Sequence, residues 1–261
     1  MIRLNSDEID QWLVQAERLW LFLDYDGTVA DFAPVRGQVT PDREVVDLLA
    51  RLSSHPTIRV AVISGRRLSD VQTLLPVQGI YLGGVYGLEV QTPDQEIIQR
   101  AEYQYVRQFI DRLKLLWEGI VVSRPGFYLE DKDWSLALHT PVDGSADIDQ
   151  VLSAAQQAAG DVLPVNQFHF IGGTKFLEAA PVEADKGKTV GYLLSNFQWP
   201  DSRLLYIGDD DQDVQAFEVI HSNGGITILV SGPGRRLGPP HADLILPSPQ
   251  AVRRWLQNLA R

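Results

Sequence analysis

The chain has 261 residues, of which 44% are hydrophobic and 22% are charged, so it is large enough to bury a core and has the balance of an ordinary folded protein. Its net charge of −11 argues against nucleic acid or an anionic membrane as partner, because both attract Lys and Arg. It contains no Cys and no apolar run long enough to span a membrane, so we expect a cytoplasmic protein without disulfides, zinc–thiolate sites or a cysteine nucleophile.

Short apolar runs alternate with amphipathic segments in the first and last thirds of the chain. We expect a first helix that ends at about residue 18. Further helices are expected at 42–53, 68–75, 186–197, 211–220 and the C-terminal residues. We expect strands at 19–23, 58–64, 80–82, 204–208, 225–230 and 243–246. These runs are apolar on both faces, which indicates a parallel sheet covered by helices.

The alternation breaks after Gly87. The pattern there predicts a hairpin at 88–98, helices at 99–117 and 145–159, and antiparallel strands at 121–124, 127–131, 134–140, 166–171 and 175–179. We therefore expect an α/β fold, a Rossmann-like parallel-sheet core with an inserted α+β cap. The core should comprise residues 1–88 and 183–261, the cap 89–182, with hinges near 87–89 and 181–184.

The segment DYDGT follows the apolar strand at 19–23. Residues two apart on a strand point the same way, so Asp24 and Asp26 are expected to converge beyond the sheet edge, where Gly27 lets the chain turn. Two carboxylates that lose solvation together require a cation or a catalytic duty. A calcium loop is excluded, because its sixth and twelfth positions are Val29 and Val35 rather than Gly and Glu.

Three further segments follow strands or open a helix at the edge where open parallel sheets bind ligands. The acidic run at 209–213 supplies Asp209, the best candidate to hold a hard cation such as Mg²⁺ together with Asp24. Lys186 opens a helix and is expected to neutralise phosphate and carboxylate charge; its segment is no P-loop, because position 182 is Val. Ser64 suits either a helix cap or a hydrogen bond to a phosphoryl oxygen.

The order DYDGT, Ser64, Lys186 and GDDDQD resembles the haloacid dehalogenase-like phosphatase superfamily, and most closely the trehalose-6-phosphate phosphatase family. The segments 129–139 and 175–181 also resemble the cap pattern of that family. The resemblance covers residues 19 to 220.

The resemblance implies roles for the core residues. Asp24 would attack phosphorus to give an aspartyl-phosphate, and Asp26 would act as general acid and base. Mg²⁺ would be held by Asp24, the Asp26 carbonyl and Asp209, while Ser64 and Lys186 would bind phosphoryl oxygens. Supporting positions are Thr28, which fixes the loop, and Asp210 and Asp213, which orient Lys186 or metal-bound waters.

By the same resemblance, the substrate is a small sugar phosphate. The implied substrate contacts are Arg66, Gly87, Glu130, Lys132, His139 and Glu178. The chain departs from the trehalose-6-phosphate phosphatase pattern in three places: Thr140 and Pro141 stand where an Arg usually follows the cap His, Tyr86 replaces a His before Gly87, and Ala180 replaces an Arg. These departures leave the phosphatase chemistry intact and open the choice of sugar.

Several alternatives therefore stay open. The substrate is trehalose 6-phosphate, or another glycosyl phosphate such as glucosyl- or mannosyl-3-phosphoglycerate or sucrose 6-phosphate. A phosphomutase would need a second phosphate site, and nothing in the predicted cap obviously provides one. A phospho-accepting regulatory domain needs neither Asp26 nor a long insert, and a catalytically dead sugar sensor would have lost a core residue. We expect a monomer or weak dimer.

Overall fold

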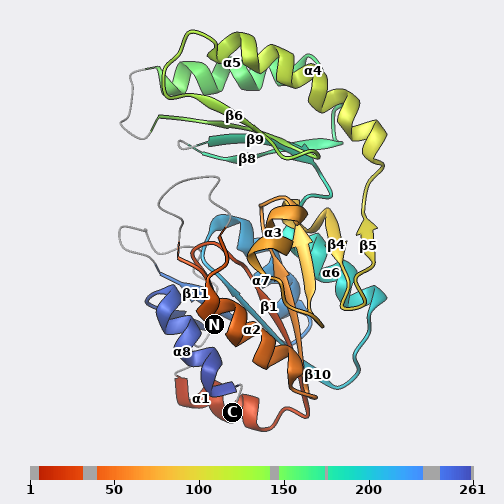
Figure 1. Cartoon of the computed structure of the whole chain (residues 1–261), viewed down its shortest axis with the longest axis vertical. Coiled ribbons are helices and arrows are strands. Elements are labelled where there is room, and N and C mark those ends of the chain that lie inside the picture. Colours follow the sequence, from red (N-terminus) through yellow and green to blue (C-terminus); the bar gives the residue numbers. More distant parts are fainter. Residues whose placement is uncertain (1–5, 32–39, 142–146, 174–175, 232–241, 260–261) are drawn as a thin grey trace. The chain divides into compact units, whose positions relative to one another are not determined.

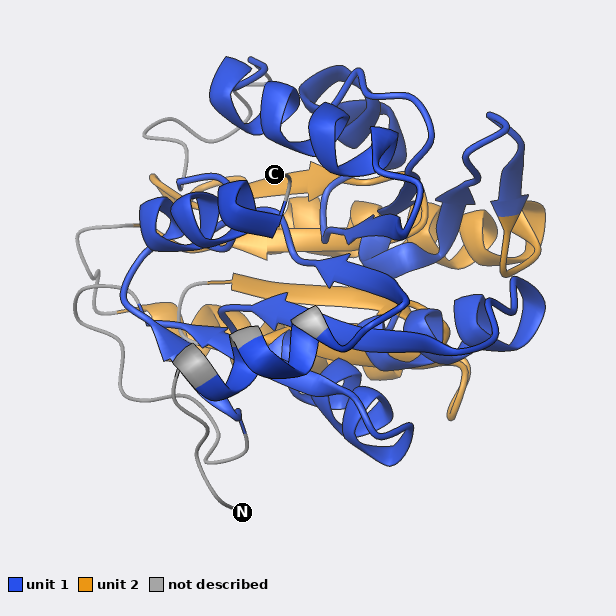
Figure 2. Ribbon diagram, turned by 90° about the horizontal axis from the view of Figure 1, so that it is seen from below, with its two compact units in different colours: residues 1–98, 185–261 blue, residues 99–184 orange. Residues whose placement is uncertain are grey.

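The computed structural model describes residues 6–31, 40–141, 147–173, 176–231 and 242–259. The chain divides into two compact units, coloured separately in Figure 2. The core unit comprises residues 1–98 and 185–261, and the cap unit comprises residues 99–184.

The core unit is built on an eight-stranded sheet in the order β12-β11-β10-β1-β2-β3-β4-β5 (Figure 1). The strands are β1 (Arg18–Leu23), β2 (Ile58–Ile63), β3 (Tyr81–Gly84), β4 (Glu89–Gln91), β5 (Ile97–Gln99), β10 (Ser202–Gly208), β11 (Ile226–Val230) and β12 (Leu244–Leu246). Pairing is parallel from β12 to β3 and antiparallel between β3 and β4. The α/β class and the parallel core predicted from the sequence are confirmed.

Helices cover both faces of this sheet because the central strands are apolar on both sides. Alternate residues of β1 separate the layers: Leu21 and Leu23 belong to one hydrophobic cluster, and Trp20 and Phe22 to the other. The first cluster includes side chains of α1 (Ser6–Val14), α2 (Arg43–Ser54), α3 (Leu68–Leu74) and α8 (Pro249–Leu259); the second includes those of α6 (Lys186–Asn196) and α7 (Val214–Ser222).

The cap unit is a four-stranded antiparallel sheet, ordered β6-β7-β9-β8, with two helices. Its elements are α4 (Tyr103–Val121), β6 (Tyr128–Asp131), β7 (Leu136–His139), α5 (Ile148–Gly160), β8 (Phe168–Gly172) and β9 (Phe176–Pro181). Cross-strand partners share a face, so Leu129, Leu138 and Leu177 lie on one side of the sheet. Glu130, Ala137 and Glu178 lie on the other.

Three sequence predictions differ from the structure. The first helix ends at Val14 rather than near Arg18, because Arg18 already pairs with β10. Residues 121–124 are no strand: Val121 ends α4, and the Val122 N–H still donates to the Glu118 carbonyl, so the helix continues through the β-branched pair. The helix expected at 211–220 begins as a 3₁₀ turn, Asp211–Asp213, before α7.

The boundary of the inserted unit also differs. The prediction placed residues 89–98 in the cap, whereas the compact cap unit begins at Gln99 and ends at Ala184. The reason is that the hairpin formed by β4 and β5 extends the core sheet, with Leu82 opposite Gln91 and Gly84 opposite Glu89.

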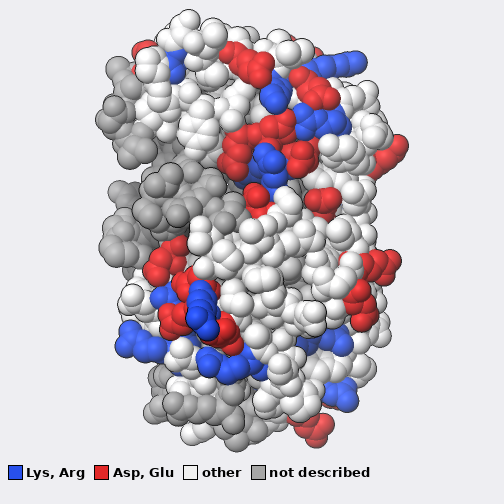
Figure 3. All heavy atoms as spheres, in the orientation of Figure 1, with Lys and Arg blue, Asp and Glu red and all other residues white. Residues whose placement is uncertain are grey.

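The surface carries mixed charge. On the face shown in Figure 3, basic side chains are interspersed with acidic ones across the described residues. None of the helices in the described ranges combines the length and the hydropathy that crossing a bilayer requires.

Candidate active site

The carboxyl ends of three neighbouring strands bring the predicted core residues together. Asp24 follows β1, Ser64 follows β2 and Asp209 follows β10, and β1 pairs in parallel with both of the other strands. All three side chains are buried. Residues that are 40 to 185 positions apart in sequence therefore meet at one edge of the core sheet.

Lys186 joins this edge as the first residue of α6. The helix begins there because Asp185 caps it: the Asp185 carboxylate accepts a 2.7 Å hydrogen bond from the Lys188 N–H. The Lys186 ammonium is 2% exposed and donates to Asp24 Oδ1 and to Asp213 Oδ1, both at 2.7 Å. One buried cation therefore links two buried carboxylates.

Asp213 is held by four donors. Its Oδ1 accepts from Lys186 and from the Tyr206 hydroxyl at 2.8 Å. Its Oδ2 accepts the backbone N–H groups of Asp209 and Asp210 at 2.8 and 3.0 Å. Gly208 permits this arrangement, because a Cβ on Gly208 would lie 2.3 Å from the Asp213 carboxyl carbon.

Tyr206 was not predicted as part of the site. It lies in the apolar strand LLYIG and is fully buried, and its hydroxyl reaches Asp213 from within the sheet. A signal was present, since a Tyr inside an apolar strand must find a partner for its hydroxyl. The sequence did not indicate which group that partner would be.

The protonation of this cluster is governed by burial and by Lys186. Burial raises the pKa of Asp24 well above its ordinary value, and Lys186 only partly opposes the shift. Burial alone would lower the pKa of Lys186, but Asp213 and Asp24 together raise it. The pKa of Asp213 is lowered, because Lys186 and the hydrogen-bond donors outweigh its burial. Burial raises the pKa of Asp210 to about 6.

The carboxylates of Asp24, Asp209 and Asp213 suit a cation. One oxygen from each lies within 4.8 Å of the others, and all three residues are buried. Asp24 Oδ2 is buried without a hydrogen-bond partner among the described residues. Both oxygens of Asp213 already accept hydrogen bonds, so Asp24 and Asp209 are the better ligands. A divalent cation that prefers oxygen fits this set.

Asp26 does not belong to that set of three carboxylates; its side chain is bound by Arg66. The guanidinium donates through Nε to Asp26 Oδ2 and through Nη2 to Oδ1, each at 2.6 Å, which is a bidentate pair. Ser64 lies beside it: its Oγ accepts the Arg66 N–H at 3.2 Å, and it is not the cap of α3, whose N-cap residue is Arg67. The Ser64 hydroxyl proton is thus available to another acceptor.

Two predicted loop residues have structural contacts. Thr28 Oγ1 lies 3.5 Å from Asp209 Oδ1, a long contact that joins the DYDGT loop to β10. Gly87 has a φ of 85°, and a Cβ there would lie 2.2 Å from Thr189 on α6. The Thr189 hydroxyl donates to the Tyr86 carbonyl at 2.8 Å. Gly87 is therefore needed for close packing against the helix that carries Lys186.

The cap unit holds a second buried polar cluster, built around Glu178. Glu178 is fully buried on β9; its Oε2 accepts from Lys132 Nζ at 2.8 Å and its Oε1 from the Ser135 hydroxyl at 2.6 Å. Lys132, 8% exposed, is the less buried of the charged pair.

Glu130 and His139 form a neighbouring pair on the same face of the cap sheet. Glu130 Oε2 lies 2.7 Å from His139 Nε2, and the His139 ring stacks on Tyr128 with centroids 4.6 Å apart. The predicted cap residues therefore form two clusters, Lys132 with Glu178 and Glu130 with His139, on adjacent strands.

Comparison with known proteins agrees with this architecture. A model of the trehalose-phosphatase family matches residues 22–234, which is most of the chain. The probable trehalose-phosphate phosphatase of Sinorhizobium fredii is 28% identical over 261 residues, covering 98% of this chain and 90% of that protein.

Solved structures show the same fold. The C-terminal domain of the Candida albicans trehalose-6-phosphate phosphatase aligns with a TM-score of 0.83 at 18% identity, covering 99% of this chain and 97% of that one. A haloacid dehalogenase-like hydrolase from Bacteroides thetaiotaomicron aligns with a TM-score of 0.64 at 14% identity, covering 93% and 100%. The site residues lie inside the matched range, and the chain belongs to the trehalose-phosphatase family of phosphoric monoester hydrolases.

Proposed function

We propose that this protein is a Mg²⁺-dependent phosphatase that hydrolyses trehalose 6-phosphate to trehalose and phosphate. The observation that carries the proposal is the state of Asp24, a buried carboxylate with one oxygen on Lys186 and the other without a hydrogen-bond partner among the described residues. Relatives named as trehalose-phosphate phosphatases supply the choice of sugar.

The proposed reaction proceeds in two displacements at phosphorus. Asp24 Oδ2 forms a bond to phosphorus while the bond from phosphorus to the sugar oxygen breaks, which gives an aspartyl-phosphate. Asp26 gives its proton to the departing sugar oxygen and then takes one from the attacking water, so that the second displacement restores Asp24 and releases phosphate.

Lys186 and Ser64 would stabilise charge on the phosphoryl oxygens during both steps. Lys186 is held by Asp213 as well as by Asp24, so it keeps its position when one Asp24 oxygen becomes esterified. Asp24, the Asp26 carbonyl and Asp209 would hold Mg²⁺, which would supply Lewis-acid charge neutralisation when bound. Asp210 would support these metal ligands by capping the turn at 211–213, and Thr28 would support them through its contact with Asp209.

Arg66 would hold Asp26 in place and would have to release one of its oxygens for the two proton transfers, because a carboxylate with both oxygens on the guanidinium carries no proton to give. The bidentate pair fixes the Asp26 carboxylate, and the guanidinium adds positive charge where an anionic substrate arrives. Gly87 would keep the neighbouring loop close to α6, which makes its contribution to substrate binding indirect.

The cap residues are proposed to select the leaving group. Lys132 and Glu130, with His139 beside it, present charged donors and acceptors of the kind that sugar hydroxyls bind. Both Glu178 oxygens are occupied within the cap, which supports a role in orienting Lys132. The absence of the family's usual side chains at Tyr86, Thr140 and Ala180 keeps another glycosyl phosphate as the second candidate.

The test is phosphate release in Mg²⁺ from a panel of substrates, with Asp24→Asn as the blank. The panel contains trehalose 6-phosphate, sucrose 6-phosphate, glucose 6-phosphate, glucosyl- and mannosyl-3-phosphoglycerate, and p-nitrophenyl phosphate. We expect trehalose 6-phosphate to be preferred and Asp24→Asn to lose on the order of 10³-fold or more in kcat.

Preference for another member of the panel would move the specificity and keep the mechanism. Full activity of Asp24→Asn would remove the nucleophile, and no turnover by a folded protein would favour the phospho-accepting regulatory domain. A cytoplasmic location and a monomeric or weakly dimeric state are further parts of the proposal, and size-exclusion chromatography with light scattering tests the second.

A further inference from the structure

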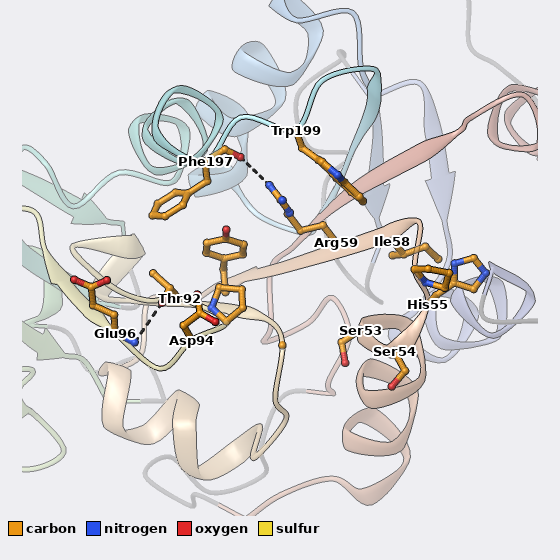
Figure 4. Close-up of a pocket in the computed structure, with 14 residues that line it drawn as sticks. Ser53, Ser54, His55, Ile58, Arg59, Thr92, Asp94, Glu96, Phe197 and Trp199 are labelled. Atoms are coloured by element: carbon orange, nitrogen blue, oxygen red, sulfur yellow. Dashed lines mark hydrogen bonds between the residues drawn. The ribbon is translucent and has the colours of Figure 1, made fainter.

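A separate cavity of about 520 Å³ lies in the core unit, at the amino ends of the parallel strands (Figure 4). It is lined by the end of α2, the starts of β2 and β3, the loop between β4 and β5, and the segment after α6. Arg59 is the second residue of β2 and Ser64 follows the last, so five residues at about 3.3 Å each put roughly 16 Å between this cavity and the phosphatase site.

One wall of the cavity is aromatic and held in place. The Arg59 guanidinium lies 4.6 Å from the Trp199 ring centroid and 4.7 Å from that of Trp20. Arg59 Nη1 also donates to the Phe197 carbonyl at 2.7 Å, as the dashed line in Figure 4 marks. Tyr81 packs edge-on against the Phe197 ring at 5.2 Å. Tyr81 is 5% exposed and Arg59 covers one face of Trp199, so the aromatic surface of this wall comes from the half-buried Phe197 and Trp199 side chains.

The opposite rim is polar and also fixed. Asp94 and Glu96 are exposed on the loop between β4 and β5. That loop is closed by three hydrogen bonds: Thr92 N–H to the Glu96 carbonyl, Gln95 N–H to the Thr92 carbonyl, and Glu96 N–H to the Thr92 hydroxyl, at 2.8, 2.9 and 3.2 Å.

Two hydroxyls from the end of α2 complete the rim. Ser53 and Ser54 both donate to the Ala50 carbonyl, at 3.1 and 2.7 Å, so their oxygen lone pairs remain to accept hydrogen bonds. Among the described residues, the hydrogen bond to the Phe197 carbonyl uses one of the five N–H donors of the Arg59 guanidinium.

This combination specifies a ligand chemistry. The half-buried Phe197 and Trp199 can pack against C–H groups, carboxylates and hydroxyls accept hydrogen bonds, and the guanidinium donates them, so the lining favours a ligand with both C–H surface and hydroxyls. Asp94 and Glu96 outnumber Arg59, which disfavours an anion. An apolar ligand would leave the carboxylates desolvated. We propose that this cavity binds a neutral mono- or disaccharide, as a sugar site separate from the phosphatase centre.

The test follows the Trp199 indole N–H in ¹H–¹⁵N spectra of the whole protein, its signal identified by its loss in Trp199→Phe. Trehalose, maltose and glucose are titrated separately, and reading Trp199 separates this site from product binding at Asp24. We expect at least one sugar to shift the signal. Asp94→Asn should weaken the binding of that sugar about tenfold, because one charged hydrogen bond is lost.

Asp94 is exposed, so its substitution should leave the fold intact, and Asp47→Asn, which removes an exposed acid from α2, is the matched control with unchanged affinity. Phosphate release by Asp94→Asn should equal that of the unsubstituted protein. The proposal is overturned if no sugar shifts the Trp199 signal, if Asp94→Asn binds as tightly as Asp47→Asn, or if inorganic phosphate shifts the signal as strongly as sugar. None of these outcomes bears on the proposed phosphatase activity.

Discussion

The core and the cap each contain a buried lysine that donates to a buried carboxylate, but the two clusters differ in how the carboxylate oxygens are bound. In the cap, Lys132 donates to Glu178 Oε2 and the Ser135 hydroxyl donates to Glu178 Oε1. In the core, Lys186 serves Asp24 and Asp213, with Asp209 close by, and Asp24 Oδ2 has no hydrogen-bond partner among the described residues. The core thus keeps one buried carboxyl oxygen without a hydrogen-bond donor among the described residues, whereas both oxygens of Glu178 in the cap accept hydrogen bonds.

The difference indicates two kinds of chemistry. A buried carboxyl oxygen without a donor is costly, which favours the binding of a cation and is consistent with the proposed role of Asp24. A carboxylate with both oxygens bound, as in Glu178, holds neighbouring side chains in place, which fits the proposed role of the cap in selecting the sugar. Substitutions that change one cluster and spare the other test this contrast.

The largest effect is expected from Asp213→Asn. Asp213 is fully buried and accepts from Lys186, Tyr206 and two backbone N–H groups, so an amide would place donors against donors and leave Lys186 partly uncompensated. We expect a loss of about 3–5 kcal/mol in the free energy of unfolding, measured by urea denaturation. Asp211→Asn, an exposed acid in the same turn, is the control, and equal stability of the two variants would contradict the importance of the network.

Asp209→Asn should act on the metal and spare the fold. Removing one of two carboxylate ligands should weaken Mg²⁺ binding by about 100-fold, or about 2.7 kcal/mol, as measured by titration calorimetry and by the Mg²⁺ dependence of phosphate release. Asp211→Asn again serves as control. Unchanged Mg²⁺ binding would mean that Asp24 and Asp213 hold the ion without Asp209.

Glu178→Gln tests the cap cluster. The amide keeps the shape of the side chain but weakens the hydrogen bond from Lys132, so Lys132 is less well positioned. We therefore expect kcat/KM for trehalose 6-phosphate to fall about tenfold, or about 1.4 kcal/mol. Hydrolysis of p-nitrophenyl phosphate, which has no sugar, should change little. Glu118→Gln replaces an exposed carboxylate on the cap helix α4 and is the matched control. Equal losses on both substrates would argue that Glu178 maintains the fold rather than sugar selection.

Much of the core could be predicted because its signals are local. An apolar strand that is followed by Asp24 predicts both the sheet and the edge at which ligands bind. The apolar strands that precede Ser64 and Asp209 predict the same edge. The family resemblance then assigned roles that the residue pattern alone left open. The coarse outline of the α+β insertion was likewise readable from its alternating strands.

The pairings across the fold could not be predicted. Asp26 is tied to Arg66 and Gly87 is packed against Thr189, contacts that join residues 40 and 102 positions apart. The hairpin of β4 and β5 looks the same in sequence whether it belongs to core or cap, since only its pairing with β3 decides. Register across distant segments was the missing information.

The smallest effect concerns an ion pair that supports the cap cluster from the helix side. Asp131, next to Lys132, accepts from Arg107 Nη1 and Nη2 at 2.7 Å, and Lys114 lies 3.1 Å away. The hydrogen bond from Arg107 holds the pKa of Asp131 far below its ordinary value. Because the folded pKa is depressed, the stabilisation is complete above the unfolded value of about 3.9 and is lost as pH falls below it.

Asp131→Asn should therefore lower the free energy of unfolding by about 1 kcal/mol at neutral pH, a figure kept small because the pair is partly exposed. The difference from the unsubstituted protein should shrink as the pH is lowered below about 4, followed by thermal unfolding across pH. Asp47→Asn breaks a solvated pair with Arg43 and should have no measurable effect at any pH. A difference that grew on acidification would mean that Asp131 is stabilised in its neutral form, so that the Arg107 pair contributes nothing to holding the strand that carries Glu130.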